Sequence, residues 1–396
     1  MCDLSKNASD NLLILLEGME DPRKKKGVRY KYADLLLMCI YAVLCGHSTA
    51  VDIAAYTEDY LEYFKELLHI EQRPSHDTFS RIMRLTDFDK LSEILGRWLQ
   101  ENFPEICTRY NGYRLLHLDG KAIRGAAKKS DGEKPRYVMN MMYEGESISV
   151  KIGEVGDKEN EISILKEYLE PLALKNTIVT ADAMSTNDTI LSYLTQKGAD
   201  YVVPLKDNQP RLKAVVEDEI EKLEKSGEFK ELDHSMTFSK EHGRIETVHA
   251  RVLKDTSFIY ENLGLESFYG TVARIGIIDK KSVKTEKGKE VTSENRMLLI
   301  TSLEWVSAEQ IHMIRKAHWN IEMNHWQLDI QLDEDRCTAR RENAMSTGAV
   351  LRRFCLAVKA RDMEMKDKTL KRFLQANERS TDRLEKLLFG TVASQA

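Results

Sequence analysis

The chain has 396 residues, of which 42% are hydrophobic and 31% are charged, and its formal net charge is -5 at pH 7. This length allows two or three domains with sizeable cores, and the composition excludes large-scale disorder. The acidic balance counts against a protein that coats nucleic acid, because phosphate binding usually needs a basic surface.

The most apolar stretch, residues 35–45, is too short to span a bilayer and predicts a buried helix. The N-terminus lacks a charged-then-apolar secretory layout, so residence in the cytosol is expected. The six cysteines show no paired C-x-x-C spacing. We expect reduced thiols, several of them buried, rather than zinc ligands or disulfides.

Residues 11–102 carry apolar residues at helical spacing and predict a separate helical domain. Within it, residues 74–81 resemble a helix start with Ser75 or Asp77 as the cap. The helix that follows carries Arg81 and Arg84. The sequence leaves open whether it belongs to a helix-turn-helix that presents these arginines to DNA or only packs on the core.

Residues 113–205 predict a strand-rich block followed by alternating helices and strands. The expected strands are 115–118, 136–142, 147–155, 177–180 and 201–205, with a turn at 143–146 and helices at 160–169 and 187–196. Three antiparallel strands, helix, strand, helix, strand is the order of an RNase H-like fold. In that fold the first and fourth strands are neighbours, so Asp119 and Asp182 are expected to meet at their ends.

The region from residue 209 to residue 298 predicts a charged helix, two strands and a Lys-rich turn. The expected helix is 212–226, the strands are 246–253 and 269–278, and the turn lies near Lys287. A strand at 297–300 then leads into a helix at 307–330, where Ser307 and Gln310 form a plausible capping box. The tail after residue 360 is highly charged.

Asp119 and Asp182 each end an apolar run, and Glu322 lies on the long helix at the border of its mostly apolar face. Trp319 and Trp326 are expected to shield the helix around it. Three carboxylates about 4 Å apart repel by roughly 4 kcal/mol per pair at an effective dielectric near 20, so they need divalent cations. Two strand-end aspartates and a helical glutamate therefore suggest a two-metal phosphodiester site. The alternative is that each acid caps or solvates its own element.

Several short strings around these acids occur in a characteristic order. They are Leu118-Asp119-Gly120-Lys121, Asn160-Glu161-Ile162, Asp182-Ala183-Met184, Gly198-Ala199-Asp200-Tyr201, Lys206-Asp207-Asn208-Gln209, His242-Gly243-Arg244-Ile245-Glu246, His318-Trp319-Asn320-Ile321-Glu322 and His325-Trp326-Gln327-Leu328-Asp329. Together they resemble the transposases of the H-repeat-associated family, insertion-sequence enzymes with an Asp-Asp-Glu triad on an RNase H-like core. The resemblance runs from Asp21 to about Lys359.

The resemblance implies an α/β fold: an RNase H-like catalytic core, with a mixed five-stranded sheet and helices, preceded by an all-α domain. The expected domains are 1–108, which binds DNA ends, and 109–396, which is catalytic and carries a β-containing insertion at about 210–297. The implied enzyme binds the terminal inverted repeats of its element, cleaves them and joins the 3′ ends to target DNA. Its catalytic and metal-binding residues are Asp119, Asp182 and Glu322, with two Mg²⁺ or Mn²⁺ ions. The expected partners are double-stranded DNA and a second copy in the synaptic complex, with no membrane, at the bacterial nucleoid.

Candidate DNA contacts follow from basic and polar residues near these motifs, with structural capping or a solvated face as the alternative. They are Arg81, Arg84, Lys121, Arg124, Lys206, Asn208, Gln209, His242 and Arg244. Basic clusters at residues 23–31, 121–129 and 336–353 are also candidates, and the third includes Arg352 and Arg353.

One departure from related transposases concerns the glutamate helix. Hairpin-forming relatives place a Tyr and an Arg before the glutamate and a Lys after it; here Arg315, His318 and Asp329 stand at those positions, which leaves the excision route open. A zinc site of His318, Glu322 and His325 is a weaker alternative, since the family uses hard oxygen ligands. A nuclease without strand transfer and a non-catalytic DNA-binding remnant are the competing functions.

Overall fold

The computed structural model describes residues 12–24, 28–103, 109–123, 136–143, 154–155, 165–167, 169–170, 172–182, 187–207, 209–241, 244–264, 267–286, 289–337 and 343–389. The chain forms two compact units that interleave in sequence. Unit 1 comprises Met1–Cys107, Gly120–Gly156 and Glu322–Ala396, and unit 2 comprises Thr108–Asp119 and Asp157–Ile321. The expected boundary near residue 108 separates a part that is expected to bind DNA ends from a part that is expected to be catalytic.

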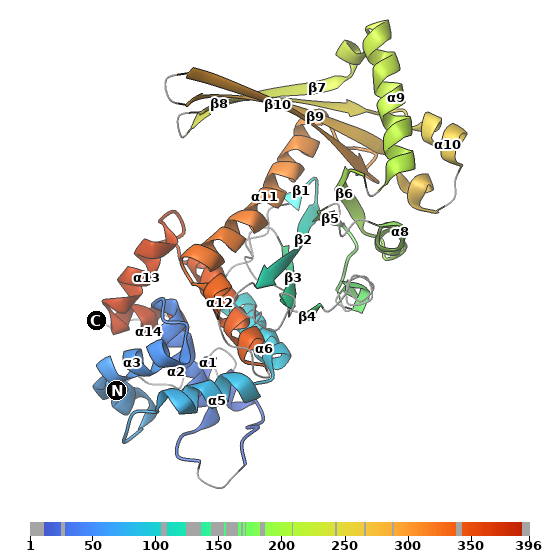
Figure 1. Ribbon diagram of the computed structural model, residues 1–396. Helices are drawn as coiled ribbons and strands as arrows, with labels where there is room; N and C mark the ends of the chain where they lie inside the picture. Colours follow the sequence, from blue (N-terminus) through green and yellow to red (C-terminus); the bar gives the residue numbers. More distant parts are fainter. Residues whose placement is uncertain are drawn as a thin grey trace, which may run out of the picture. The chain divides into compact units, whose positions relative to one another are not determined.

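Within the described residues, the strands form a 10-stranded sheet in the order β4-β3-β2-β5-β6-β10-β9-β8-β7, with β1 paired to β2 (Figure 1). The strands are β1 (Arg109–Tyr110), β2 (Tyr113–Ile123), β3 (Arg136–Tyr143), β4 (Glu154–Val155), β5 (Thr177–Ala181), β6 (Asp200–Leu205), β7 (Asp233–Glu241), β8 (Arg244–Leu253), β9 (Arg274–Glu286) and β10 (Lys289–Thr301). Strands β2, β5 and β6 are parallel, whereas the pairs from β6 through β10 to β7 are antiparallel. The fold is therefore mixed α/β with a mostly antiparallel sheet.

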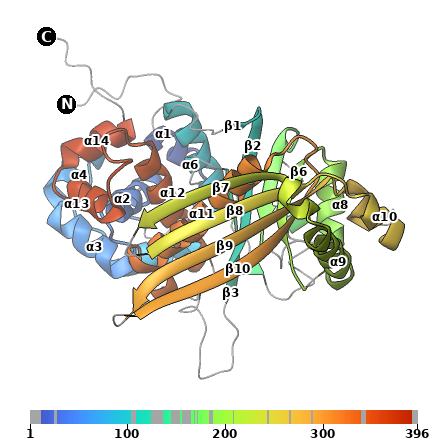
Figure 2. The same ribbon diagram turned by 90° about the horizontal axis from the view of Figure 1, so that it is seen from above.

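In addition to these strands, the described part of unit 2 contains several helices. They are α8 (Asp188–Gln196), α9 (Pro210–Ser226), α10 (Ser257–Leu263) and most of α11 (Ala308–Ile330), with the short 3-10 turns η4 (Glu228–Glu231) and η5 (Ser267–Thr271). Figure 2 shows β7, β8, β9 and β10 running side by side, with α8, α9 and α10 gathered near one end of them. The predicted strands 115–118, 136–142, 177–180 and 201–205 and the helices 187–196 and 212–226 are confirmed within a few residues.

The four-stranded extension differs most from expectation. Strand β7 was not predicted, residues 269–271 lie in η5 instead of a strand, and β10 begins at Lys289 rather than near residue 297. Residues 290–296 are exposed, and Phe238 on β7 is 67% exposed. Because both faces of these strands meet solvent there, the sequence lacks the alternation that marks a half-buried strand. Of the expected strand 147–155, turn 143–146 and helix 160–169, residues 144–153, 160–164 and 168 lie outside the described residues, and residues 165–167 are helical.

Helix α11 begins with the predicted capping box. The Gln310 backbone N–H donates to Ser307 Oγ at 3.3 Å, and the Ser307 N–H donates to Gln310 Oε1 at 2.9 Å. Two orphan donors of the first turn are thereby satisfied. Trp319 and Trp326 are 51% and 50% exposed. About half of each side chain is therefore open to solvent, and the Lys280 Nζ lies 5.3 Å from the centroid of the Trp319 ring.

Unit 1 is built mainly of helices, which confirms the helical N-terminal region. They are α1 (Leu12–Glu17), α2 (Tyr32–Leu44), α3 (Ala50–Asp59), α4 (Leu61–Leu68), α5 (His76–Leu85), α6 (Phe88–Asn102), α12 (Ala344–Arg361), α13 (Leu370–Glu378) and α14 (Thr381–Phe389), with the 3-10 turn η6 (Glu334–Arg336). Ser75 is the N-cap of α5, and its hydroxyl accepts from the Thr78 N–H at 3.3 Å. This confirms one of the two expected caps.

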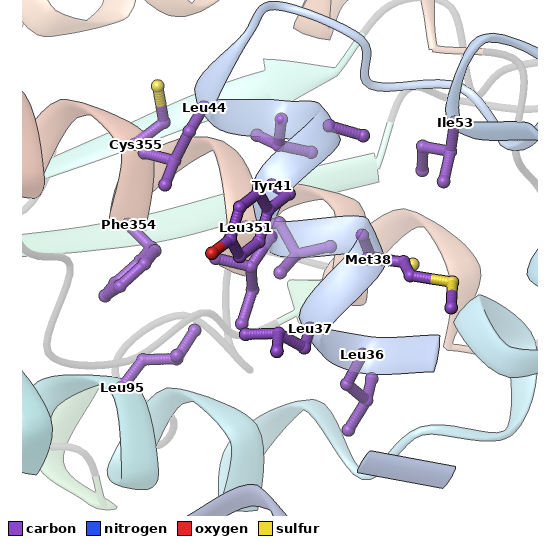
Figure 3. Packing of buried hydrophobic residues seen from close by; sticks show 14 of the residues in the cluster. Leu36, Leu37, Met38, Tyr41, Leu44, Ile53, Leu95, Leu351, Phe354 and Cys355 are labelled. Carbon is purple, nitrogen blue, oxygen red and sulfur yellow. The ribbon is translucent and has the colours of Figure 1, made fainter. Parts of the chain in front are cut away.

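The core of unit 1 joins distant parts of the chain. Every residue of α2 is buried, which confirms the predicted buried helix. Its leucines pack among residues of α3, α6 and α12 (Figure 3). The charged tail adds Leu370, Phe373, Leu384 and Leu388 to the same core. The C-terminal helices are thus part of the helical unit.

Two arginines of the third basic cluster are structural. Arg352 and Arg353 on α12 are only 2% and 4% exposed. The Arg353 guanidinium pairs with the Glu334 carboxylate at 2.5 Å, and Arg352 donates to the Leu332 carbonyl at 2.9 Å. Neither side chain is open to DNA, so the expectation of a solvated basic face is wrong for them.

Cys39, Cys45 and Cys355 are buried free thiols and Cys337 is a partly exposed one, as expected; Cys2 and Cys107 lie outside the described residues. Burial raises the pKa of Cys45 to about 12. Among the helices described, none has the length and apolarity that crossing a membrane requires.

Candidate active site

Two of the three candidate acids belong to neighbouring parallel strands: Asp119 lies within β2, and Asp182 directly follows β5. Leu118 of β2 pairs with Ala181 of β5, so Asp119 and Asp182 are the next residues on adjacent strands. Neighbouring strands lie about 4.8 Å apart. Leu115–Leu118 of β2 and all of β5 are buried, whereas Asp119 is half-buried and Asp182 is exposed. The register therefore puts the two acids on neighbouring strands where the buried run gives way to solvent.

The pleat places these acids on a defined face of the sheet. Side chains two residues apart on a strand share a face, so Leu115 and His117 share the face of Asp119. Their partners on β5 are Ile178 and Thr180, which likewise lead to the second aspartate. Helix α11 covers this face, because Ile311 and Ile314 join Leu115 and Ile178 in one buried cluster.

A buried hydrogen-bonded chain connects both strands to α11. Thr180 Oγ1 lies 2.6 Å from His117 Nδ1 and 2.8 Å from His318 Nδ1. His117 is 0% exposed, Thr180 2% and His318 2%. Burial lowers the pKa of His117 to about 3, and the nearby His318 and Arg315 act in the same direction. His117 is therefore neutral at physiological pH.

Glu322 is the first residue of the last segment of unit 1 and is exposed on α11. Asp119 and Asp182 belong to unit 2. Within the described part of the chain, no group of three or more His, Cys, Asp or Glu side chains is arranged to hold a metal ion. His318, a member of the alternative zinc set, points its Nδ1 at Thr180 and is buried.

The candidate DNA contacts of unit 2 lie after β6 and around the start of β8. Lys206 is exposed after β6 and borders a pocket between β6, β10 and α9 whose α9 wall is largely acidic, and Gln209 precedes α9. Arg244 is exposed at the start of β8, and its side chain pairs with Glu246 at 2.9 Å. Asn208, His242 and Arg124 lie outside the described residues, as does the side chain of Lys121. In unit 1, Arg81 is exposed on α5 and Arg84 is half-buried.

The sequence interpretation did not single out His117 or Thr180. Both are polar residues inside apolar strand runs, and each stands two positions before a candidate acid. This repeated two-residue spacing is the feature of the sequence that could have identified them. Their pairing across the sheet and to His318 depends on the register and on the covering helix, which only the structure supplies.

Two family models match this chain and together span most of it. "Transposase DDE domain" matches residues 110–358, and "DDE_Tnp_1-associated" matches residues 13–99. The first match alone covers more than half of the chain. The protein therefore belongs to the family of DDE-domain transposases.

Relatives in Escherichia coli (strain K12) agree with this family. YbfL is 28% identical over 87% of this chain and 89% of its own length. The protein named "H repeat-associated putative transposase YhhI" is 27% identical over the same shares of the two chains. Among solved structures, the piggyBac transposase synaptic complex with hairpin DNA is similar at a TM-score of 0.39 and 11% identity, covering 94% of this chain and 76% of that one. A likeness that low does not establish a shared fold.

Proposed function

We propose that the chain is a DNA transposase that binds the inverted-repeat ends of its insertion sequence, cleaves them and joins the 3′ ends to target DNA. Asp119, Asp182 and Glu322 are its proposed catalytic residues. The observation that carries the proposal is the register of β2 and β5: Leu118 pairs with Ala181, and Asp119 and Asp182 come next along the two strands. The strand order β4-β3-β2-β5-β6 supports an RNase H-like core, since β2 and β5 correspond to its first and fourth strands.

The four-residue spacing between His318 and Glu322 on α11 supports a place for Glu322 near Asp119 and Asp182. Helix α11 runs along β2 and β5. Ile311 and Ile314 share a buried cluster with Leu115 and Ile178. His318 is hydrogen-bonded to Thr180, two residues further along β5. Four helical residues advance about 6 Å, and two strand residues advance about 6.6 Å. Glu322, one turn beyond His318, therefore matches the advance from Thr180 to Asp182.

The donor set suits hard divalent cations. Carboxylate oxygens at an open, partly solvated edge are the ligands that Mg²⁺ and Mn²⁺ prefer, so we assign two such ions to these three residues. When bound, such ions activate the attacking water or 3′-hydroxyl and offset charge on the leaving oxygen. The side chains hold the site, keep it anionic before loading and leave its solvent side open to a phosphodiester. No side chain is needed as a general base.

DNA binding is assigned to both parts of the chain. We propose that residues 1–108 bind DNA ends, with Arg81 and Arg84 as contacts, and that residues 109–396 form the catalytic domain, with the insertion at 210–297. Lys121, Arg124, Lys206, Asn208, Gln209, His242 and Arg244 are the proposed contacts there. Two copies are expected in the synaptic complex, because both ends of an element must react together, and the bacterial nucleoid is the expected place of action.

Single substitutions test the acids. Asp119→Asn, Asp182→Asn and Glu322→Gln are each expected to lower the rate of end cleavage by at least about 100-fold, because each removes an anionic oxygen ligand. Affinity for the end DNA, measured without divalent ions, should stay within a few-fold. Glu309→Gln, which removes an exposed carboxylate from the first turn of the same helix, serves as the control and should cleave normally. Cleavage at the wild-type rate by any of the three variants contradicts the assignment.

A strand-transfer assay separates the transposase from its competitors. A labelled end with a free 3′-hydroxyl is incubated with supercoiled target DNA and Mg²⁺ or Mn²⁺. Joined products support the transposase, cleavage without joining supports a nuclease, and binding without either reaction supports a DNA-binding remnant.

A further inference from the structure

Each proposed catalytic residue is preceded by one member of the buried chain His117–Thr180–His318. His117 lies two residues before Asp119, Thr180 two residues before Asp182 and His318 four residues before Glu322. Two residues on a strand and four on a helix both return the side chain to the same face. All three members belong to unit 2 and form one buried layer there.

We propose that this chain is the positioning device of the active site: Thr180, accepting from one histidine and donating to the other, fixes where α11 lies on β2 and β5 and thereby sets where Glu322 stands. The inference rests on the proposed function of the three acids. These three are positioning residues, since none is expected to touch DNA or metal. His318 stands where hairpin-forming relatives carry an Arg, and at 2% exposure it is turned inward.

Hydrogen bonding sets the direction of the chain. A threonine hydroxyl has one proton, so the Thr180 O–H donates to one histidine at most and its oxygen accepts from the other. The Nε2 of His117 is buried and has no partner among the described residues. A buried N–H without an acceptor is rarer than a buried lone pair without a donor. His117 is therefore assigned as the Nδ1–H tautomer, which donates to Thr180, and Thr180 donates to Nδ1 of His318.

This arrangement fixes the helix more sharply than apolar packing does. The cluster of Ile311, Ile314, Leu115 and Ile178 resists separation, but such contacts are nondirectional and tolerate sliding. Hydrogen bonds of 2.6 and 2.8 Å weaken steeply when their angle or length changes. A slide of α11 by one residue breaks the bond between Thr180 and His318, so this bond selects a single register of the helix, while the His117–Thr180 bond holds the hydroxyl in place.

The test removes the hydroxyl and then restores it. Thr180→Val keeps the side-chain shape and is expected to lower kcat for end cleavage about 10- to 100-fold, because small misplacements of catalytic groups cost that much. The Kd for end DNA without divalent ions and the KM should stay within a few-fold. Thr180→Ser, which keeps the hydroxyl, is expected to recover most of the lost kcat.

Matched variants guard against a merely structural effect. Thr177→Val on the same strand removes an equally buried hydroxyl that has no partner among the described residues, and it should leave kcat unchanged. His318→Asn retains an acceptor close to the Nδ1 position and should cleave faster than His318→Leu. If Thr180→Val does not fold, the comparison of His318→Asn with His318→Leu tests the proposal instead.

A spectroscopic readout does not depend on activity. In protein labelled with ¹⁵N-histidine, and assigned with His117→Gln and His318→Gln, the Nδ1 of His117 should carry a proton and the Nδ1 of His318 should not. Thr180→Val should shift both signals. Equal tautomers in the two rings, or a folded Thr180→Val protein with wild-type kcat, overturns the inference. Wild-type cleavage by an acid variant instead refutes the proposed function, so the two failures are distinguishable.

Discussion

At the scale of single residues, the buried polar groups indicate which side chains pair inside this protein. His117, Thr180 and His318 satisfy one another inside unit 2, and Arg353 pairs with Glu334 inside unit 1. A polar group without a partner is costly to bury, so such residues indicate specific pairings. Asp34 on α2 is a contrasting case, because burial at 4% exposure raises the pKa of its carboxyl.

Replacing that carboxyl tests its cost. A raised pKa in the folded state means that the folded protein holds the proton more tightly than the unfolded chain does, so ionisation of Asp34 lowers stability as the pH rises above about 4. Asp34→Asn is therefore expected to raise the thermal midpoint at pH 7, with a gain that shrinks towards pH 3. Thermal unfolding followed by circular dichroism at both pH values measures this.

The control for Asp34→Asn is Glu62→Gln, in the first turn of α4 with 85% of its side chain exposed. Its surface pair with Lys65 is expected to contribute little at either pH. A lower midpoint for Asp34→Asn at pH 7 would show that the charged form is stabilised by the fold.

At the scale of elements, the sequence pattern predicted helices and strands that have one buried face. It missed strand segments that are exposed on both faces. The capping box at Ser307 and the cap at Ser75 were found because they depend on residues only three positions apart. Strand β7 and the first half of β10 were missed because their outer parts are exposed on both faces. Element boundaries set by pairing with a partner strand leave little trace in a single sequence.

The Glu334–Arg353 pair ties η6, which follows α11, to α12. The two side chains are 1% and 5% exposed. Arg353→Met is expected to destabilise unit 1 by about 3–5 kcal/mol, because it leaves a buried carboxylate without its partner. The double variant Arg353→Met/Glu334→Leu should lose less, since no charge then remains buried.

Chemical denaturation of the single and double variants measures this coupling. Arg336→Met is the control, because its side chain is 86% exposed and its pair with Asp333 lies at the surface. Equal losses for Arg353→Met and Arg336→Met would show that the buried pair adds nothing beyond a surface one.

At the scale of the whole molecule, neither unit is continuous in sequence. Unit 1 combines three segments, and its core joins α2 near one end of the chain to α12, α13 and α14 near the other. The sequence of the tail after residue 360 indicated only its charge, because apolar residues such as Phe373 and Leu384 stand in short groups between charged ones. Their role depends on a partner surface more than 300 residues away in sequence.

The tail is therefore expected to matter for folding although it carries no proposed catalytic residue. Phe373 is 0% exposed, and Phe373→Ala should cost about 3–5 kcal/mol through the cavity that it leaves. Lys371→Ala on the exposed side of the same helix should cost less than about 0.5 kcal/mol. Denaturant unfolding compares the two, and equal small losses would show that α13 does not belong to the cooperative unit.

The sequence by itself determined the family, most helices and strands, the caps and the neighbouring placement expected for Asp119 and Asp182, because these depend on local patterns and on a strand order read directly from the chain. Only the tertiary structure decided that His117, Thr180 and His318 bind one another, that Arg352 and Arg353 are buried, and that the tail completes the N-terminal core. Those pairings join segments that no local pattern links, and their free energy exists only when the chain has folded.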